Sequence, residues 1–129
     1  MSVTEDRLAP AGPDVVYGAF VHGTLAGVVG IAREARAKNR HKAVVFGMYV
    51  APDFGRRGVA RALVRHLIAT AKDEAGLEQL VLTVTHSNDA ARLLYESEGF
   101  RSFGVEPRAI RVGDRYYDKN HMVRFLEAG

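Results

Sequence analysis

The sequence contains no cysteine and no apolar run long enough to cross a bilayer. Without cysteine, disulfides, thiolate metal sites and a cysteine nucleophile are all excluded. A membrane-spanning helix needs about 20 consecutive apolar residues, and the first ten residues, MSVTEDRLAP, lack the apolar core of a signal peptide. We therefore expect a cytoplasmic protein that has no metal site and no membrane partner.

The charge balance is only mildly basic. Eighteen Lys and Arg residues against fifteen Asp and Glu residues give a formal net charge of +3, which suits a polyanionic ligand and does not by itself exclude nucleic acid. The most basic segment, residues 33–42, has no aromatic residue between its charges for base stacking. Such a run is typical of a solvated hairpin end, so nucleic acid is disfavoured as a partner.

A chain of 129 residues, 47% of them hydrophobic, is long enough for one domain with its own core. Residues 1–14 are polar and contain two prolines, so we expect a loose segment there, with a helical fragment over residues 5–9 as the alternative. Residues 15–127 then form the domain. Its first part, residues 15–21 and 25–32, predicts a β-hairpin around a tight His-Gly turn.

Residues 44–71 combine a buried strand, a loop with the sequence GRRG and a long amphipathic helix. Unpaired amides at the start of a helix bind anions, and nearby guanidinium groups suit a pyrophosphate. The spacing fits neither the P-loop nor the three-glycine dinucleotide fingerprint. The pattern therefore predicts a phosphate site of another type.

The helix from residue 59 is expected to bury one apolar stripe, formed by Ala60, Leu63, Val64, Leu67, Ile68 and Ala71.

A second strand, residues 80–85, follows this helix and should lie parallel to the first in a right-handed βαβ unit. Next comes a short helix that Ser87 or Asn88 can cap. On this helix Asn88, Ala91 and Tyr95 share one face. Capping and packing explain that face as well as a functional site does.

Two further features concern the sheet. Gly47 lies within an apolar run, residues 43–50, and predicts a bulge or a close backbone approach. Residues 102–112 and 116–126 flank a Gly-Asp turn and predict a closing hairpin.

Two motifs in this order resemble those of the GNAT superfamily of N-acetyltransferases. The segment GRRGVA, residues 55–60, is similar to that family's acyl-CoA loop, Arg/Gln-x-x-Gly-x-Gly/Ala, except that Gly55 stands where the family has Arg or Gln. The segment NDAARLLYESEGF, residues 88–100, matches every fixed position of the signature Asn-x-x-Ala-x-x-x-Tyr-x-x-x-Gly-Phe. The resemblance covers roughly residues 15–126.

The resemblance implies an α/β fold with a central mixed, mostly antiparallel sheet, a splayed pair of parallel strands and flanking helices. The family's fold usually opens with a strand and two helices that form much of the acceptor pocket, and here that opening is expected to be reduced or missing. Either the acceptor site is then unusually open, or a second subunit in a homodimer supplies the missing wall, or the chain is a truncated form with impaired catalysis.

The resemblance also implies direct transfer of an acetyl group from acetyl-CoA, the co-substrate, to a primary amine of a small molecule or protein. In that reaction Tyr95 donates a proton to the leaving thiolate, and a backbone amide near residues 48–50 polarises the acetyl carbonyl. Asn88 binds the pantetheine arm. The implied cofactor-binding residues are Met48, Tyr49, Val50, Arg56, Arg57, Gly58, Val59, Ala60, Arg61 and Asn88.

The general base is left open. Many relatives carry a carboxylate on or beside the strand before the loop, and residues 43–50 contain none. The remaining routes are proton loss through water and the side chains of Glu34, His86, Glu106 and Asp118. Arg108, Asp118 and His121 are polar residues that could face an acceptor, whose identity is also open. The missing base makes a non-catalytic acyl-CoA-binding sensor or regulatory module the alternative function.

Overall fold

The computed structural model describes residues 1–7 and 14–126. The elements within these residues are β1 (Ser2–Arg7), β2 (Asp14–Val21), β3 (Thr24–Arg33), a 3-10 turn (Ala37–Asn39), β4 (Lys42–Val50), a second 3-10 turn (Pro52–Phe54), α1 (Val59–Lys72), β5 (Gln79–Thr85), α2 (Asp89–Ser97), β6 (Arg101–Val112) and β7 (Arg115–Phe125).

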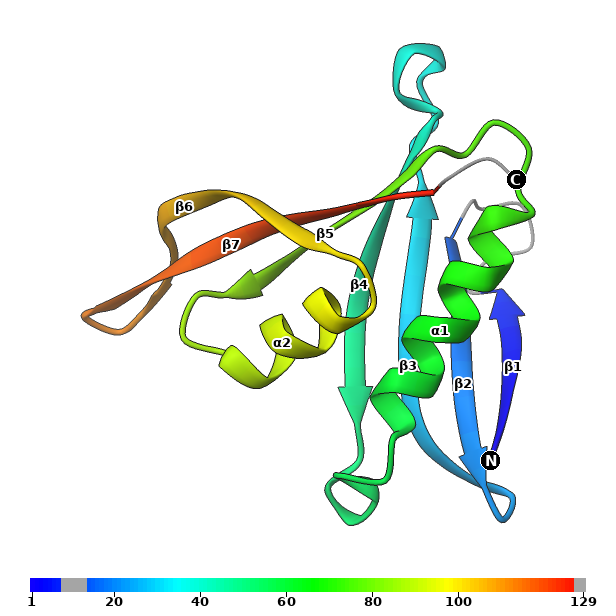
Figure 1. Ribbon diagram of the computed structural model, residues 1–129. Helices are drawn as coiled ribbons and strands as arrows, with labels where there is room; N and C mark the ends of the chain where they lie inside the picture. The colour runs from blue at the N-terminus through cyan, green and yellow to red at the C-terminus, as the bar shows by residue number, and fades with distance from the viewer. Residues whose placement is uncertain (8–13, 127–129) are drawn as a thin grey trace.

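Within the described ranges the strands form one sheet in the order β1-β2-β3-β4-β5-β7-β6. Neighbouring strands are antiparallel except β4 and β5, which α1 connects as a parallel pair. The predicted β2–β3 hairpin, the parallel pair and the closing β6–β7 hairpin are thereby confirmed. Figure 1 shows α1 and α2 in front of this sheet, with β5, β6 and β7 turned away from the first four strands.

The parallel pair separates soon after it forms. Only Lys42 to Val44 of β4 pair with β5, opposite residues 79–81, and beyond them the two strands diverge on either side of α2 (Figure 1). Gly47, with a φ of 66°, lies in β4 where the register with β3 shifts. This confirms the predicted bulge, which bends the strand after its last contact with β5.

Helix α1 covers one face of the sheet. Its buried stripe is Val59, Leu63, Val64, Leu67, Ile68 and Ala71, so the register of the expected stripe is right except that Val59 replaces Ala60 at its start. Burial of each Leu or Val side chain contributes roughly 1.5–3 kcal/mol, which fixes the start of the helix against the strands. At 14 residues α1 is the longer helix, and no helix in the described ranges could span a membrane.

The opposite face of the sheet, called the open face here, has neither α1 nor α2 packed on it. Because side chains alternate along a strand, the neighbours of core residues point to this face, and large apolar side chains remain exposed on it. Their exposed fractions are 36% for Phe46, 60% for Tyr49, 61% for Phe103 and 49% for Phe125. Where such side chains form a contiguous patch, the patch often marks a binding site.

The first strand differs from the loose segment expected over residues 1–14. Ser2 to Arg7 pair with β2, from Ser2 opposite Phe20 to Arg7 opposite Val15, so the alternative of a helix over residues 5–9 is wrong for residues 5–7. An edge strand forms backbone hydrogen bonds to only one neighbour and needs only one apolar face. The polar sequence of β1 therefore lacks the apolar alternation by which a strand is recognised. The part of the chain described before β2, residues 1–7, contains a strand and no helix.

Candidate active site

A slot lies between β4 and β5 where these two strands separate. The cavity has a volume of about 360 Å³ and is lined by Val45, Phe46, Gly47, Met48, Leu82, Thr83, Val84, Thr85, Asn88, Ala91 and Tyr95. Val45 and Leu82 are buried on the α1 face, whereas Phe46 and Thr83 alternate onto the open face. The slot is therefore bordered by side chains of both faces.

The loop before α1 forms a second hollow of about 290 Å³, which Gly58 and the first residues of α1 line. Gly58 is the N-cap of α1 with a φ of 75° and no side-chain cap, and a Cβ there would meet nothing within 4 Å. The first amides of the helix are thus left for an anion. These features fit the pyrophosphate of CoA.

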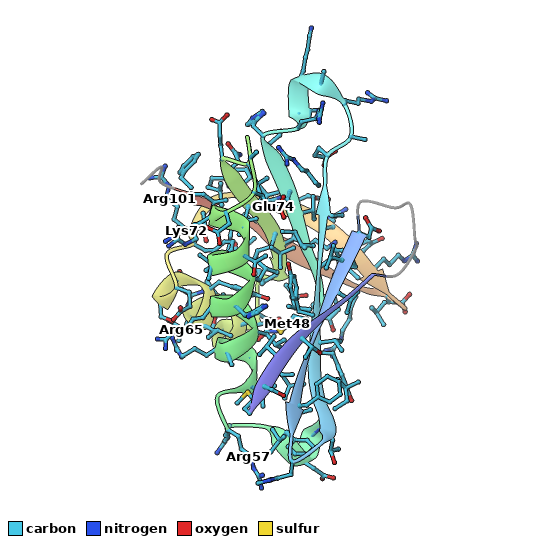
Figure 2. All side chains as sticks on the ribbon, turned by 90° about the vertical axis from the view of Figure 1, so that its right-hand side faces the viewer. Met48, Arg57, Arg65, Lys72, Glu74 and Arg101 are labelled. Carbon is cyan, nitrogen blue, oxygen red and sulfur yellow. The ribbon has the colours of Figure 1, made fainter. Side chains whose placement is uncertain are left out.

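The arginines of this loop lie in different places. Arg56 lines the hollow and holds an unusual positive φ of 62°. The guanidinium of Arg57 lies over the ring of Phe54, 5.6 Å from its centroid, and Figure 2 shows Arg57 beyond the end of α1 opposite to Lys72. Arg57 is not among the residues that line the hollow.

Arg61 connects α1 to α2. Its Nη1 donates to Ser97 Oγ at 3.0 Å and to Glu98 Oε2, while Arg65 Nε donates to Glu98 Oε1 at 3.0 Å. Hydrogen bonds from Arg65 and Arg61 lower the pKa of Glu98 below its ordinary value. The expected role of Arg61 was to hold the pyrophosphate, and in the structure its guanidinium already has an anionic partner on α2.

The slot and the loop hollow lie next to each other. Leu94 of α2 lines the hollow at the loop, and Tyr95, the next residue, lines the slot. On β4, Met48 lines the slot and Val50 lines the loop hollow. A ligand that occupies both would follow β4 on one side and α2 on the other.

Tyr95 is the buried side chain of α2. Its ring meets Phe100 edge to face, with centroids 5.5 Å apart, and only 5% of the residue is exposed. Burial raises the pKa of the Tyr95 hydroxyl above its ordinary value of 10.0. The phenol therefore stays protonated at neutral pH and can act as a proton donor in the slot.

Asn88 caps α2, because its Oδ1 accepts a hydrogen bond from the Ala91 amide at 3.2 Å. It also lines the slot, where its side-chain NH₂ remains a donor for a ligand. The two explanations of Asn88 given by the sequence, cap and ligand contact, are therefore compatible.

The predicted residues divide into three groups. Met48, Asn88 and Tyr95 come together at the slot, and Val50, Arg56, Gly58, Val59, Ala60 and Arg61 at the loop hollow. Tyr49 instead lies on the open face, and Arg57 stacks on Phe54. Five further lining residues were not predicted from the sequence: Phe46, Phe54, Thr83, Thr85 and Leu94. Among them only Thr83 and Thr85 had a signal in the sequence, which is their alternation onto one strand face.

The candidate bases also lie in different places. Asp118 Oδ1 accepts from the Arg108 amide at 2.9 Å, and His86 Nδ1 lies 3.1 Å from Oδ1 of the buried Asn120. Glu34 lines a larger hollow of about 650 Å³ on the open face, as does His121. His121 Nε2 lies 2.9 Å from Glu106 Oε1.

Residues 1–7 and 14–126 contain no cluster of three metal-ligating side chains.

Known proteins resemble this chain in sequence. A protein 46% identical over 59 residues is the [ribosomal protein bS18]-alanine N-acetyltransferase of Escherichia coli, and the match spans 46% of this chain and 39% of that protein. The N-alpha-acetyltransferase RimI of Mycobacterium tuberculosis is 37% identical over 74% of this chain and 57% of its own length. The L-amino acid N-acetyltransferase AaaT of Escherichia coli is 32% identical over 93% of this chain and 74% of its own length.

Solved structures agree with the sequence matches. An acetyltransferase of the GNAT family from Streptococcus pneumoniae superposes with a TM-score of 0.84 at 26% identity, over 92% of this chain and 70% of that one. The ribosomal-protein-S18-alanine N-acetyltransferase of Escherichia coli does so with a TM-score of 0.76 at 27% identity, over 91% and 72%. A family model described as the Acetyltransferase (GNAT) family matches residues 2–100, and the chain therefore belongs to this family.

Proposed function

We propose that the protein is an N-acetyltransferase that moves an acetyl group directly from acetyl-CoA to a primary amine. The observation that carries this proposal is the adjacency of the two hollows: an anion site at the start of α1 and a slot that contains a buried phenol. The pyrophosphate would lie on the amides after Gly58 beside Arg56, and the pantetheine arm would enter the slot between β4 and β5.

The chain's own groups account for most of the chemistry. Beyond Val44 the backbone of β4 has no pairing with β5 in the described residues, so an amide after the bulge at Gly47 is available to polarise the acetyl carbonyl. The pantetheine amides can take the place of the missing strand partner. Tyr95 supplies the proton that the departing thiolate needs. No covalent enzyme intermediate is required, which suits a chain without cysteine.

The relatives suggest where to look for the acceptor. Their names refer to an alanine of a ribosomal protein, to N-alpha acetylation and to L-amino acids. We therefore propose that the acceptor is an α-amino group of a peptide or a free amino acid.

The test is release of CoA thiol from acetyl-CoA with a panel of amines. The panel contains free L-amino acids, peptides that begin with alanine, and polyamines as a different class of primary amine. Turnover that requires an amine supports the proposal. Binding of acetyl-CoA without turnover for any amine would instead identify a sensor or regulatory module.

A further inference from the structure

We propose that His121, held by Glu106 on the open face, is the base that takes the proton from the acceptor amine. The proposal rests on the proposed acetyl transfer. That reaction needs a proton acceptor within reach of the attacking nitrogen, and β4, the strand before the loop, has no carboxylate in its sequence KAVVFGMYV.

The position of His121 follows from the strand register. Thr83 borders the slot on β5, and His121 on β7 is its direct partner across the ladder. Neighbouring strands lie about 4.8 Å apart, so the imidazole stands one strand away from the side of the slot that faces away from the helices. An amine that enters from the open face therefore meets His121 next to the place where the slot opens.

The other candidate bases lie elsewhere. Glu34 follows Arg33, which pairs with Ala43, so Glu34 lies near Lys42, four residues before Phe46. Four residues of extended strand measure about 13 Å, too far for direct proton transfer. Asp118 holds the backbone of Arg108, and His86 contacts the buried Asn120.

Glu106 determines which imidazole nitrogen serves as the base. His121 Nε2 lies 2.9 Å from Glu106 Oε1, and an ionised carboxylate only accepts hydrogen bonds. In neutral His121 the hydrogen is therefore on Nε2, and Nδ1 carries the lone pair. The ring of Phe103 meets His121 edge to face at 5.9 Å and restricts its rotation. Glu106 is thus a positioning residue for a base whose reactive atom is Nδ1.

The hollow beside His121 has the size and lining of an acceptor site. Its volume is about 650 Å³, and Val81, Val123 and Phe125 give it apolar surface, with Glu34, Lys42 and Arg101 as charged groups. The α1-side hollows remain for the cofactor. Donor and acceptor thus approach the slot from opposite faces of the sheet.

His121 and Tyr95 take up and supply the protons of the reaction. The neutral amine attacks the acetyl carbon, a C–N bond forms, and the nitrogen passes one proton to His121 Nδ1. The C–S bond then breaks, its electron pair stays on sulfur, and Tyr95 donates a proton to the thiolate. His121 then releases its extra proton to solvent, and Tyr95 takes a proton back from solvent. The products are an amide and CoA.

The first test uses variants and the amine that the panel identifies. His121→Asn should lower kcat by roughly 100-fold or more, as expected for loss of a general base, with the Kd for acetyl-CoA changed less than about twofold. His22→Asn, at the exposed β2–β3 turn, is the matched control and should leave both unchanged. In His121→Ala, free imidazole should restore part of the lost rate, which a purely structural role does not predict.

The second test reads the tautomer. Long-range ¹H–¹⁵N spectra of histidine-labelled protein, assigned by the signals absent from His121→Asn, should show neutral His121 with its hydrogen on Nε2. Glu106→Gln should lower kcat and reduce this preference, while Glu106→Asp should restore part of both. A hydrogen on Nδ1 in the wild-type protein would overturn the proposal.

Failure of the two proposals looks different. A wild-type protein that acetylates no amine overturns the proposed function, and the role of His121 with it. An active wild-type protein whose kcat is unchanged by His121→Asn overturns only the assignment of the base.

Discussion

The ring of Phe46 lies directly over Gly30, its partner on the neighbouring strand β3. A Cβ at position 30 would stand 2.4 Å from Phe46 Cζ, so the glycine makes room for the ring. Because Phe46 also lines the slot, a substitution on β3 can change the slot without touching it directly.

Gly30→Ala should therefore change cofactor binding more than stability. The atoms in its way belong to the far end of a side chain that is 36% exposed, and rotation of that ring costs about 1 kcal/mol. We expect a small shift in the melting temperature and a measurable change in the Kd for acetyl-CoA, by calorimetry. The comparison is Gly27→Ala on the other face of β3.

At position 27 the obstacles are fixed. A Cβ there would lie 2.9 Å from the Tyr49 carbonyl oxygen and 2.9 Å from Val59 Cγ1, so the substitution would force β3 away from β4 and α1. Overpacking of this kind costs roughly 1–3 kcal/mol. Urea denaturation should show a larger loss for Gly27→Ala than for Gly30→Ala; the reverse order would contradict the assignment of the two faces.

Gly58→Asp should abolish binding of acetyl-CoA. The introduced carboxylate would cap the amides of α1 that we propose for the pyrophosphate and would repel the phosphates. Calorimetric titration with acetyl-CoA measures the effect. Gly113→Asp is the matched control, because Gly113 also has a positive φ, 61°, and open space around its Cα. Equal affinities for both variants would remove the loop from the site.

Tyr95→Phe should lower kcat by roughly 100-fold with little change in the Kd for acetyl-CoA, because the ring and its contact with Phe100 remain. Steady-state kinetics with the identified amine measures the rate. Tyr116→Phe, which removes an exposed hydroxyl on β7, should have no effect. If Tyr95→Phe keeps the full rate, the phenol only packs.

Glu98→Gln should loosen the connection between α1 and α2. The pKa of Glu98 is lowered in the folded protein, so its stabilisation is complete above the ordinary glutamate pKa of about 4.3 and is lost as the pH falls through the lower folded value. We expect a loss of about 1 kcal/mol at neutral pH and a shrinking difference from the wild type on acidification. Denaturation at pH 7 and at low pH measures this.

Glu96→Gln is the control for that experiment. Glu96 pairs with Arg92 on the same helix, at i and i+4, and does not connect two elements. Its substitution should therefore cost less than that of Glu98. A difference between Glu98→Gln and wild type that does not change with pH would show that the charge of Glu98 is not what matters.

The sequence predicted the fold and the main parts of the candidate site because their signals are local. The loop and the start of α1 are continuous in the chain, and so are the cap and the phenol of α2. The strand β1 escaped prediction, since an edge strand with a polar sequence lacks the apolar alternation that identifies one. Its pairing becomes visible only when the register with β2 is known.

Long-range pairs were the part that the sequence could not supply. Arg61 looked like a phosphate ligand beside its loop, yet it bonds Glu98 across to the next helix. The pair of His121 and Glu106 lies between two register shifts in the β6–β7 ladder, which no motif reports. Both pairs become apparent only in three dimensions.

A slot bordered by both faces of a sheet gives the two substrates separate entrances. A nucleotide that enters beside α1 and an amine that enters from the other side need not wait for each other, and neither product blocks the exit of its partner. Initial-rate plots should then intersect rather than run parallel, the kinetic signature of a ternary complex.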